Sequence, residues 1–220
     1  MQKSLKVKYL SPIRPRASSL LTSRGFFSSF VYVSIHAWKN SDCKILMKRV
    51  LTGRFFNRPT IKVSQDLLGK FLVRRKGRKI VSSMITEVEA YIGPYDRASH
   101  ASRGMTKRTK IMFGKAGYWY VYLVYGMHYC LNIVTEKEGY PAAILIRSVE
   151  HTKGPGRVCR FFDITKTFNE KKSALRTGLW VENRGNKIPK SIVAREERIG
   201  VEYAGVWSKK LWRFLIKNQR

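Results

Sequence analysis

Residues Ile80–Tyr91, with the sequence Ile-Val-Ser-Ser-Met-Ile-Thr-Glu-Val-Glu-Ala-Tyr, form the stretch that decides the fold. It is rich in β-branched and aliphatic residues, and the turn Lys76-Gly77-Arg78 separates it from a similar run, Phe71–Arg75. Two such runs around a short glycine turn predict an antiparallel β-hairpin. We therefore expect the sheet of this protein to be built around Ile80–Tyr91.

Other segments extend this pattern in both directions. Strands are predicted over residues 119–125, 129–135, 142–149 and 211–216. Thr60 is expected to cap a helix that reaches Leu68 and ends at Gly69, and Gly154-Pro155-Gly156 to open a helix over residues 157–162. Helices inserted between antiparallel strands predict an α+β fold, a single mixed domain with a central antiparallel β-sheet, a protruding β-hairpin and flanking helices.

The charge of the chain is strongly positive. Its 220 residues contain 44 Lys+Arg and 14 Asp+Glu, a net charge of +30, while 44% hydrophobic residues provide for a core. Such a surface favours a polyanion, and nucleic acid, an anionic membrane face and acidic partners all meet that description. A calcium buffer built on clustered carboxylates is excluded.

The first 46 residues differ in composition from the rest. They hold eight Lys/Arg and one acidic residue, Asp42, and are rich in serine. This composition is typical of an organellar transit peptide or an unfolded basic arm, and a start at Met47 would make the segment dispensable or spurious. We predict a basic N-terminal extension over residues 1–46 and the functional domain over residues 47–220, which still carries +23.

Cysteine and histidine spacing argues against a metal site. The three cysteines are odd in number and widely spaced, and the four histidines show no zinc-binding pattern. No run approaches 18 uninterrupted apolar residues. We therefore expect no metal, no cofactor and no membrane span.

Two carboxylates lie within the central strand. Strand alternation puts Ile85, Glu87, Glu89 and Tyr91 on one face. If they are buried, their pKa values rise unless hydrogen bonds or a cation compensate, and perturbed carboxylates are candidate general bases. The alternative is an edge strand with a solvated acidic face.

Residues 97–135 form an acid-free strip that follows the carboxylates. Its cations, which suit phosphates, are Arg97, Arg103, Lys107, Arg108, Lys110 and Lys115. Interleaved aromatic residues can pack in strands or stack on unpaired bases. Tyr125 precedes Gly126 where a hairpin should turn, so it would be displayed at a tip and could wedge into a duplex.

Three further polar residues are candidates for the site. Asn132 and Arg147 fall inside apolar runs and would be buried without an obvious local partner. A structural role is favoured for Asn132, and phosphate binding for Arg147. His100 lies in a polar loop close in sequence to the carboxylates. It is either solvated or part of a pocket wall.

Several spaced motifs together resemble the alkyladenine (3-methyladenine) DNA glycosylase family. They are Thr86–Pro94, the loop from Asp96 to Gly104, Tyr120–Ile133, Leu145–Arg147, Gly154–Cys159 and Val206-Trp207. The resemblance covers roughly residues 50–217. One departure is Thr106-Lys107-Arg108-Thr109, where the family has Thr-Pro-Arg-Asn.

The resemblance implies a role for each candidate residue. Glu89 would activate a water for attack at C1′ of a flipped nucleotide, and Tyr91, His100 and Tyr122 would wall the base pocket. Asn132 would obstruct the exocyclic amine of guanine. Tyr125 would be the intercalating wedge and Arg147 a clamp near the target phosphate, and the cationic strip adds Arg103 and Arg108 as DNA contacts.

The implied enzyme is a monofunctional DNA-3-methyladenine glycosylase of base excision repair, which hydrolyses the N-glycosidic bond and leaves an abasic site. Its partner would be double-stranded DNA containing damaged purines, bound by a monomer. It would lie with the DNA, in the cytoplasm or nucleoid of a bacterium or in the nucleus or an organelle of a eukaryote.

Two alternatives remain open at this stage. A non-catalytic basic nucleic-acid-binding protein would use its carboxylates only to pair with Arg and Lys. A metal-dependent nuclease would use Glu87 and Glu89 as ligands and lose activity in EDTA.

Overall fold

The structure, a computed structural model, describes residues 33–34 and 49–217. Its strands are β1 (Val33–Ser34), β2 (Phe71–Lys76), β3 (Lys79–Ile92), β4 (Trp119–Val124), β5 (His128–Val134), β6 (Ala142–Val149), β7 (Thr152–Lys153), β8 (Leu179–Glu182), β9 (Val193–Glu196) and β10 (Arg213–Ile216). Its α-helices are α2 (Gly53–Phe56), α3 (Thr60–Leu67) and α4 (Pro155–Phe161). The predicted extension over residues 1–46 lies outside the described residues except for β1, so it stays a prediction.

Short 3-10 helices occupy the connections. They are η1 (His100–Arg103), η2 (Lys110–Phe113), η3 (Lys166–Phe168), η4 (Leu175–Thr177), η5 (Lys190–Ile192) and η6 (Glu202–Trp207). Within the part of the chain that the structure describes, none of the helices has the length and apolar character needed to cross a membrane.

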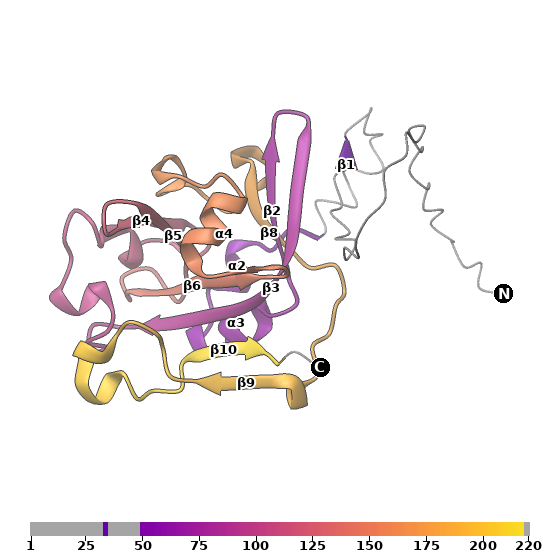
Figure 1. The fold of residues 1–220 in the computed structure, drawn as a ribbon. Coiled ribbons are helices and arrows are strands. Elements are labelled where there is room, and N and C mark those ends of the chain that lie inside the picture. The colour runs from indigo at the N-terminus through magenta and orange to yellow at the C-terminus, as the bar shows by residue number, and fades with distance from the viewer. Residues whose placement is uncertain (1–32, 35–48, 218–220) are drawn as a thin grey trace, which may run out of the picture. The chain divides into compact units, whose positions relative to one another are not determined.

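The strands pair antiparallel throughout, and β3 is their centre (Figure 1). The path across the sheet is β4-β5-β6-β3-β10-β9. The first half of β3 pairs with β2, from Met84 opposite Phe71, and its second half lies between β6 and β10. The predicted α+β domain with a central antiparallel sheet is therefore confirmed, and Ile80–Tyr91 lies within β3, its longest strand.

A β-bulge interrupts β3 at the carboxylates. Ile85 pairs with Val149 and Glu87 with Ser148, and the register shifts on both sides of Glu87. Ile85 is consequently buried in the same apolar core as Val88, so the prediction that it shares a face with Glu87 is wrong. An extra residue in one strand reverses the alternation that a regular strand would keep.

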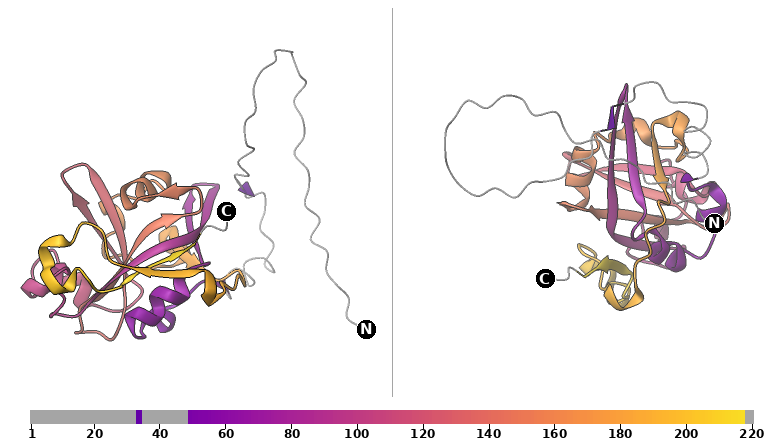
Figure 2. Two further views of the ribbon diagram at one scale, coloured as in Figure 1. Left: turned by 60° about the horizontal axis from the view of Figure 1, so that its bottom comes forward. Right: turned by 90° about the vertical axis from the view of Figure 1, so that its right-hand side faces the viewer.

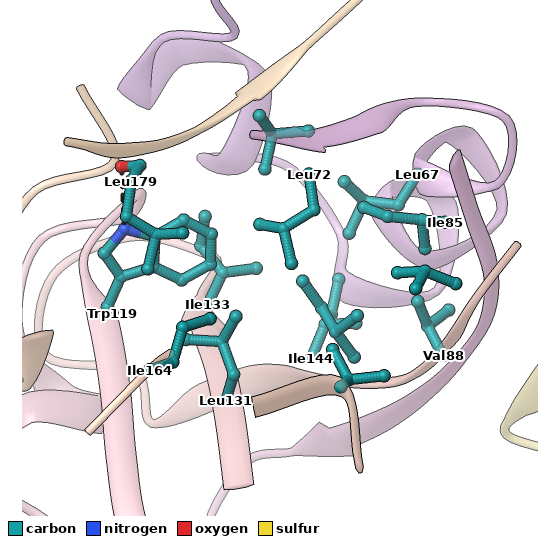
Figure 3. Packing of buried hydrophobic residues seen from close by; sticks show 14 of the residues in the cluster. Leu67, Leu72, Ile85, Val88, Trp119, Leu131, Ile133, Ile144, Ile164 and Leu179 are labelled. Atoms are coloured by element: carbon teal, nitrogen blue, oxygen red, sulfur yellow. Dashed lines mark hydrogen bonds between the residues drawn. The ribbon is translucent and has the colours of Figure 1, made fainter. Parts of the chain in front are cut away.

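The main core packs against the face of the sheet that carries Ile85 and Val88, opposite to the face of Glu87 and Glu89 (Figure 3). Apolar side chains from β3, β5 and β6 meet those of α3, and Ile85, Val88 and Ile144 are each 0% exposed. Trp119 fills the far end of this core and donates its indole N–H to the Leu179 carbonyl at 3.2 Å. A rigid apolar layer behind the sheet fixes the strands that carry the polar side chains of the opposite face.

Helix α3 begins differently from the prediction. Thr60 is its first residue rather than its cap, and Glu136 Oε1 accepts hydrogen bonds from both the Thr60 amide and hydroxyl, at 2.6 and 2.8 Å. A carboxylate near a helix N-terminus also complements the helix dipole. Gly69 follows the helix with φ of +80°, as predicted, and a Cβ there would lie 2.6 Å from Ile188 Cγ1.

Strands β4 and β5 form the predicted protruding hairpin, which extends from the body in the left view of Figure 2. Its turn contains Tyr125 and Gly126 with φ of +50° and +70°, closed by a hydrogen bond from the Met127 amide to the Val124 carbonyl. Consecutive positive φ angles match the right-handed twist of paired strands. This turn gives the hairpin tip its shape.

Candidate active site

A cavity of about 430 Å³ opens on the side of the sheet away from the main core. Side chains from β3, η1, β4, β5 and β6 line it, together with residues 199–203. Of the residues proposed from sequence, it brings together Glu89, Tyr91, His100, Arg108, Tyr122, Tyr125, Asn132 and Arg147. These residues are up to 58 positions apart in the chain, and the fold makes them neighbours.

Glu89 is the buried acid of this cavity, with 0% of its surface exposed. Its Oε1 accepts a hydrogen bond from the Ile199 amide at 2.9 Å, and its Oε2 accepts one from the Tyr91 hydroxyl at 2.9 Å. Burial raises the pKa of Glu89, while Arg147 and these two hydrogen bonds partly oppose the rise. A solvated edge strand, the alternative interpretation, is therefore wrong: β6 and β10 flank Glu89 on both sides.

Arg147 is the cation that pairs with both carboxylates of β3. Its Nη1 lies 3.2 Å from Glu89 Oε1 and its Nε 3.4 Å from Glu87 Oε1. As expected, Arg147 has no partner close in the sequence, and it meets Glu87 and Glu89 because β6 lies beside β3. The guanidinium holds the two carboxylates of β3 together at one edge of the cavity.

Tyr91 lies two residues beyond Glu89, on the same face of β3. Burial and the neighbouring carboxylate raise the pKa of Tyr91 well above its ordinary value, so its hydroxyl remains a donor. The guanidinium of Arg198 stacks behind its ring, 4.8 Å from the centroid. Tyr91 is therefore fixed at its ring and at its hydroxyl.

Three further side chains with aromatic rings line the cavity, namely His100, Tyr120 and Tyr122. The His100 ring meets the Tyr122 ring edge to face at a centroid distance of 4.7 Å, and His100 Nδ1 lies 3.0 Å from the Tyr120 hydroxyl. Burial, then repulsion from Arg108 and Arg103, lowers the pKa of His100 from 6.5 to about 4. His100 is therefore neutral at pH 7, with an apolar, polarisable ring rather than a cation against the cavity.

Asn132 occupies the floor of the cavity and is 3% exposed. Its Nδ2 donates to the Tyr120 carbonyl at 3.1 Å, across the β4–β5 pairing. Asn132 therefore has the partner that the sequence did not reveal. Any ligand that enters the cavity must therefore satisfy or avoid a fixed amide.

Tyr125 stands at the rim of the cavity, on the hairpin tip, with 88% of its surface exposed. Its neighbours Leu123 and Met127 are also exposed, at 42% and 70%. Burying apolar and aromatic groups in a bound partner is favourable, so a cluster of them on a narrow tip indicates a contact surface.

The two arginines proposed from the cationic strip differ in position. Arg108 lines the cavity, with its guanidinium 4.9 Å from the Tyr122 ring centroid and its Nη2 3.5 Å from His100 Nε2. Arg103 ends η1, is exposed and does not line the cavity. Buried Thr109 closes the Thr106–Thr109 turn, because it accepts from the Thr106 amide at 2.8 Å and donates to the Gly104 carbonyl at 3.0 Å.

Sequence reasoning missed a buried ion pair beneath the site. Asp96 and Arg198, both 0% exposed, form two hydrogen bonds of 2.6 and 2.8 Å, and Arg198 also donates to the Ala90 and Trp207 carbonyls. Arg198 directly precedes Ile199, whose amide contacts Glu89. The two partners lie 102 positions apart, and no local pattern in the chain connects them.

The described residues contain no group of three or more His, Cys, Asp and Glu side chains placed to hold a metal ion. The carboxylates that a metal-dependent nuclease would need, Glu87 and Glu89, instead share Arg147. A cation fixed between two acids occupies the position that a metal ligand set would need to leave open.

Comparison with known proteins places this geometry in one family. The family model described as methylpurine-DNA glycosylase matches residues 54–220. A protein of Methanocella arvoryzae is 44% identical over 189 residues, which cover 77% of this chain and 93% of the relative, and one of Legionella pneumophila is 44% identical over 177 residues, covering 77% and 96%. Both bear the printed name "Putative 3-methyladenine DNA glycosylase". The chain belongs to the methylpurine-DNA glycosylase family.

Proposed function

We propose that the protein is a monofunctional DNA-3-methyladenine glycosylase, which removes alkylated or deaminated purines from double-stranded DNA and leaves an abasic site in base excision repair. The observation that carries the proposal is a fully buried carboxylate, Glu89, placed in an aromatic cavity and held by Arg147 and the Ile199 amide. A nucleobase stacked in such a cavity would have its sugar beside a base catalyst. Only an extruded nucleotide can reach it.

Glu89 acts as the general base. In the reaction a water molecule gives a proton to the Glu89 carboxylate, the water oxygen bonds to C1′, and the C1′–N bond breaks with its electron pair leaving on the base. The raised pKa of Glu89 suits this role, because a base is most effective when its pKa lies near the working pH. The same negative charge stabilises the oxocarbenium-like sugar.

Tyr91, His100 and Tyr122 sandwich the extruded base. Stacking on aromatic rings contributes about 1–3 kcal/mol per base. An electron-poor alkylated base gains from contact with neutral, electron-rich rings, and the low pKa of His100 keeps that ring uncharged. Asn132, fixed by the Tyr120 carbonyl, opposes the exocyclic amine of guanine.

One aromatic side chain and several arginines make the DNA contacts. Tyr125 enters the duplex from the hairpin tip and fills the space left by the extruded base. Arg103 and Arg108 bind phosphates near the cavity mouth, and Arg147 contacts the phosphate of the target nucleotide while it remains close to Glu89. Binding as a monomer is sufficient, because one chain supplies every group named.

The reaction requires no Schiff base. Among the described residues that line the cavity, none is a lysine. A nucleophilic amine is needed for the lyase chemistry that cuts the strand after base removal. We therefore expect a product that remains intact until alkali is added, with no borohydride-trapped complex.

The proposed function is tested with end-labelled duplexes that carry single hypoxanthine, ethenoadenine or methylated purines. Incubation with the protein followed by alkali should cut the labelled strand at the lesion, while an undamaged duplex stays whole. A protein that binds these duplexes but releases no base from any of them would instead be the non-catalytic binding protein of the alternative interpretation.

Replacing Tyr125 with Ala should weaken binding to lesion duplexes and slow base release without affecting the fold. At 88% exposure the side chain has few native contacts, so the free energy of unfolding should change by less than about 0.5 kcal/mol. Loss of one stacked aromatic predicts a roughly 5- to 150-fold weaker complex with lesion DNA. Single-turnover rates and fluorescence anisotropy measure both effects.

Tyr95 provides the matched control for this prediction. It is 79% exposed and does not line the cavity, so Tyr95→Ala should behave as wild type. Equal losses in the two variants would contradict a specific role for the hairpin tip.

A further inference from the structure

Glu87 is the acid at the β3 bulge, and three side chains contact its carboxylate. Its Oε1 lies 2.9 Å from Arg213 Nη1 and 3.4 Å from Arg147 Nε, and its Oε2 accepts a hydrogen bond from the Ser148 hydroxyl. Ser148 in turn accepts one from the Gly154 amide at 3.4 Å. Only 15% of the Glu87 side chain is exposed, and it does not line the cavity.

The cation on each side of Glu87 is held differently. Arg213 has further anchors, because it pairs with Glu196 and donates to the Glu197 carbonyl at 2.8 Å. Arg147 has no acidic partner besides Glu87 and Glu89 among the described residues. The ion pair with Glu87 therefore affects both the position of Arg147 and the strength of its attraction to the Glu89 carboxylate.

We propose that Glu87 is a positioning residue of the glycosylase reaction, which holds Arg147 beside Glu89 from outside the cavity and never touches the DNA. The proposal rests on the proposed function. The bulge supports it, because without the extra residue Glu87 could not lie opposite Ser148 while Val88 returns to the core. Bulges commonly redirect a side chain next to a functional site.

The charged and titratable groups around Glu89 come from every strand packed near it. They are Glu87 and Tyr91 on β3, Arg147 on β6, Tyr122 on β4, Cys130 on β5 and Arg213 on β10, which lies opposite Glu89 in the strand register. Repulsion from Glu87 contributes to the raised pKa of Glu89, and attraction by Arg147 opposes it. Removing the Glu87 charge ends the repulsion and leaves Glu89 as the sole acid beside Arg147, so both changes lower the pKa of Glu89.

The variant Glu87→Gln tests the proposal. We expect the acidic limb of the pH–rate profile to move to lower pH, since a lower Glu89 pKa keeps the base ionised in more acidic solution. The rate on the high-pH plateau should fall roughly 10- to 100-fold, because Arg147 loses one of its two anchors and active-site geometry is sensitive to shifts of about 1 Å. A residue that only stabilises the fold would lower the melting temperature and leave the pH profile in place.

Glu196→Gln is the matched control. It removes one negative charge from the same arginine cluster but contacts Arg213 and not Arg147. We expect its pH profile and plateau rate to match wild type. Unchanged profiles in both variants, or equal shifts in both, would overturn the proposal. If Glu87→Gln does not fold, Glu87→Asp keeps the charge on a shorter side chain and should lower the plateau rate in the same direction.

A second readout separates this proposal from the proposed function. Carbon-13 NMR titration of the Glu89 carboxyl, assigned by its absence in Glu89→Gln, reports the pKa of Glu89 without any catalysis. A lower value in Glu87→Gln than in wild type and Glu196→Gln supports the electrostatic coupling of Glu87 to Glu89 even if no lesion is processed, and the plateau rate reports whether Arg147 is held in place. An unchanged value refutes the coupling even in an active enzyme.

Discussion

Glu89→Gln should lower the rate of base release by about 10²- to 10⁴-fold, the usual contribution of a general base, while lesion binding is retained. Glutamine has the same shape as glutamate and can still accept from the Ile199 amide, but it cannot take a proton from water. Single-turnover excision on a hypoxanthine duplex, with binding measured separately, checks this result. In wild type the rate should fall as pH is lowered through the raised pKa of Glu89, because protonation removes the base.

Glu182→Gln is the control for that substitution. Glu182 is equally buried, at 2% exposure, and is held by the Trp180 indole and Arg184, but it does not line the cavity. Its neutralisation should leave the rate of base release unchanged. Wild-type excision by Glu89→Gln would contradict the proposed mechanism.

Glu89→Gln should also make the protein more stable at neutral pH. Between the ordinary carboxyl pKa and the raised pKa of Glu89, the folded protein holds a proton that the unfolded chain has released. The folded state therefore loses stability as pH rises through the raised pKa. Glutamine avoids this loss, so the melting temperature of Glu89→Gln should exceed that of wild type at pH 7 and approach it in acid.

Asp96→Asn should have the largest effect on stability, a loss of about 3–5 kcal/mol in the free energy of unfolding. The substitution leaves the Arg198 guanidinium buried, at 0% exposure, without its counter-charge. For a domain of this size the melting temperature should fall by roughly 6–20 °C. Urea unfolding followed by tryptophan fluorescence, together with calorimetry, measures both quantities.

Asp163→Asn supplies the matched control. Asp163 also forms an ion pair, with Lys76 at 2.6 Å, but the two side chains are 57% and 68% exposed. A solvated pair contributes at most about 1 kcal/mol, so this variant should unfold close to wild type. Equal losses in the two aspartate variants would mean that burial does not make the Asp96–Arg198 pair essential.

Asp96→Asn also affects the site. Arg198 stacks on the Tyr91 ring and directly precedes Ile199, whose amide donates a hydrogen bond to Glu89. Loosening the Asp96–Arg198 pair should therefore weaken that hydrogen bond to the Glu89 carboxylate. We expect base release to slow below the temperature at which the variant unfolds.

Much of the fold follows from local pattern. The β2–β3 hairpin is specified by an apolar run and a β-branched run around Gly77, and α3 ends before Gly69 because that residue supports a positive φ. By contrast, Ile85 was predicted on the wrong face, since alternation does not reveal where a bulge interrupts it. The short strands β8 and β9 were not predicted, because four residues give too few positions to show a period.

The site also has a part that the sequence indicates and a part that depends on the tertiary structure. Glu89, Tyr91, His100 and Tyr122 could be named from motifs that recur in a known family, because their chemistry is tied to short stretches of chain. Ion pairs depend on which strands become neighbours: Arg147 meets Glu89 because β6 pairs with β3, and Asp96 meets Arg198 across 102 positions. Neither pairing leaves a local signal.

The sequence by itself determined the fold class, the strongly basic charge and the identity of the candidate base. Only the tertiary structure decided that Glu89 is buried, that Arg147 is shared between two acids and that Glu87 faces out of the cavity. The reason is physical. Residue type and local periodicity are properties of the chain, whereas burial and electrostatic coupling depend on distances that exist only after distant strands have paired.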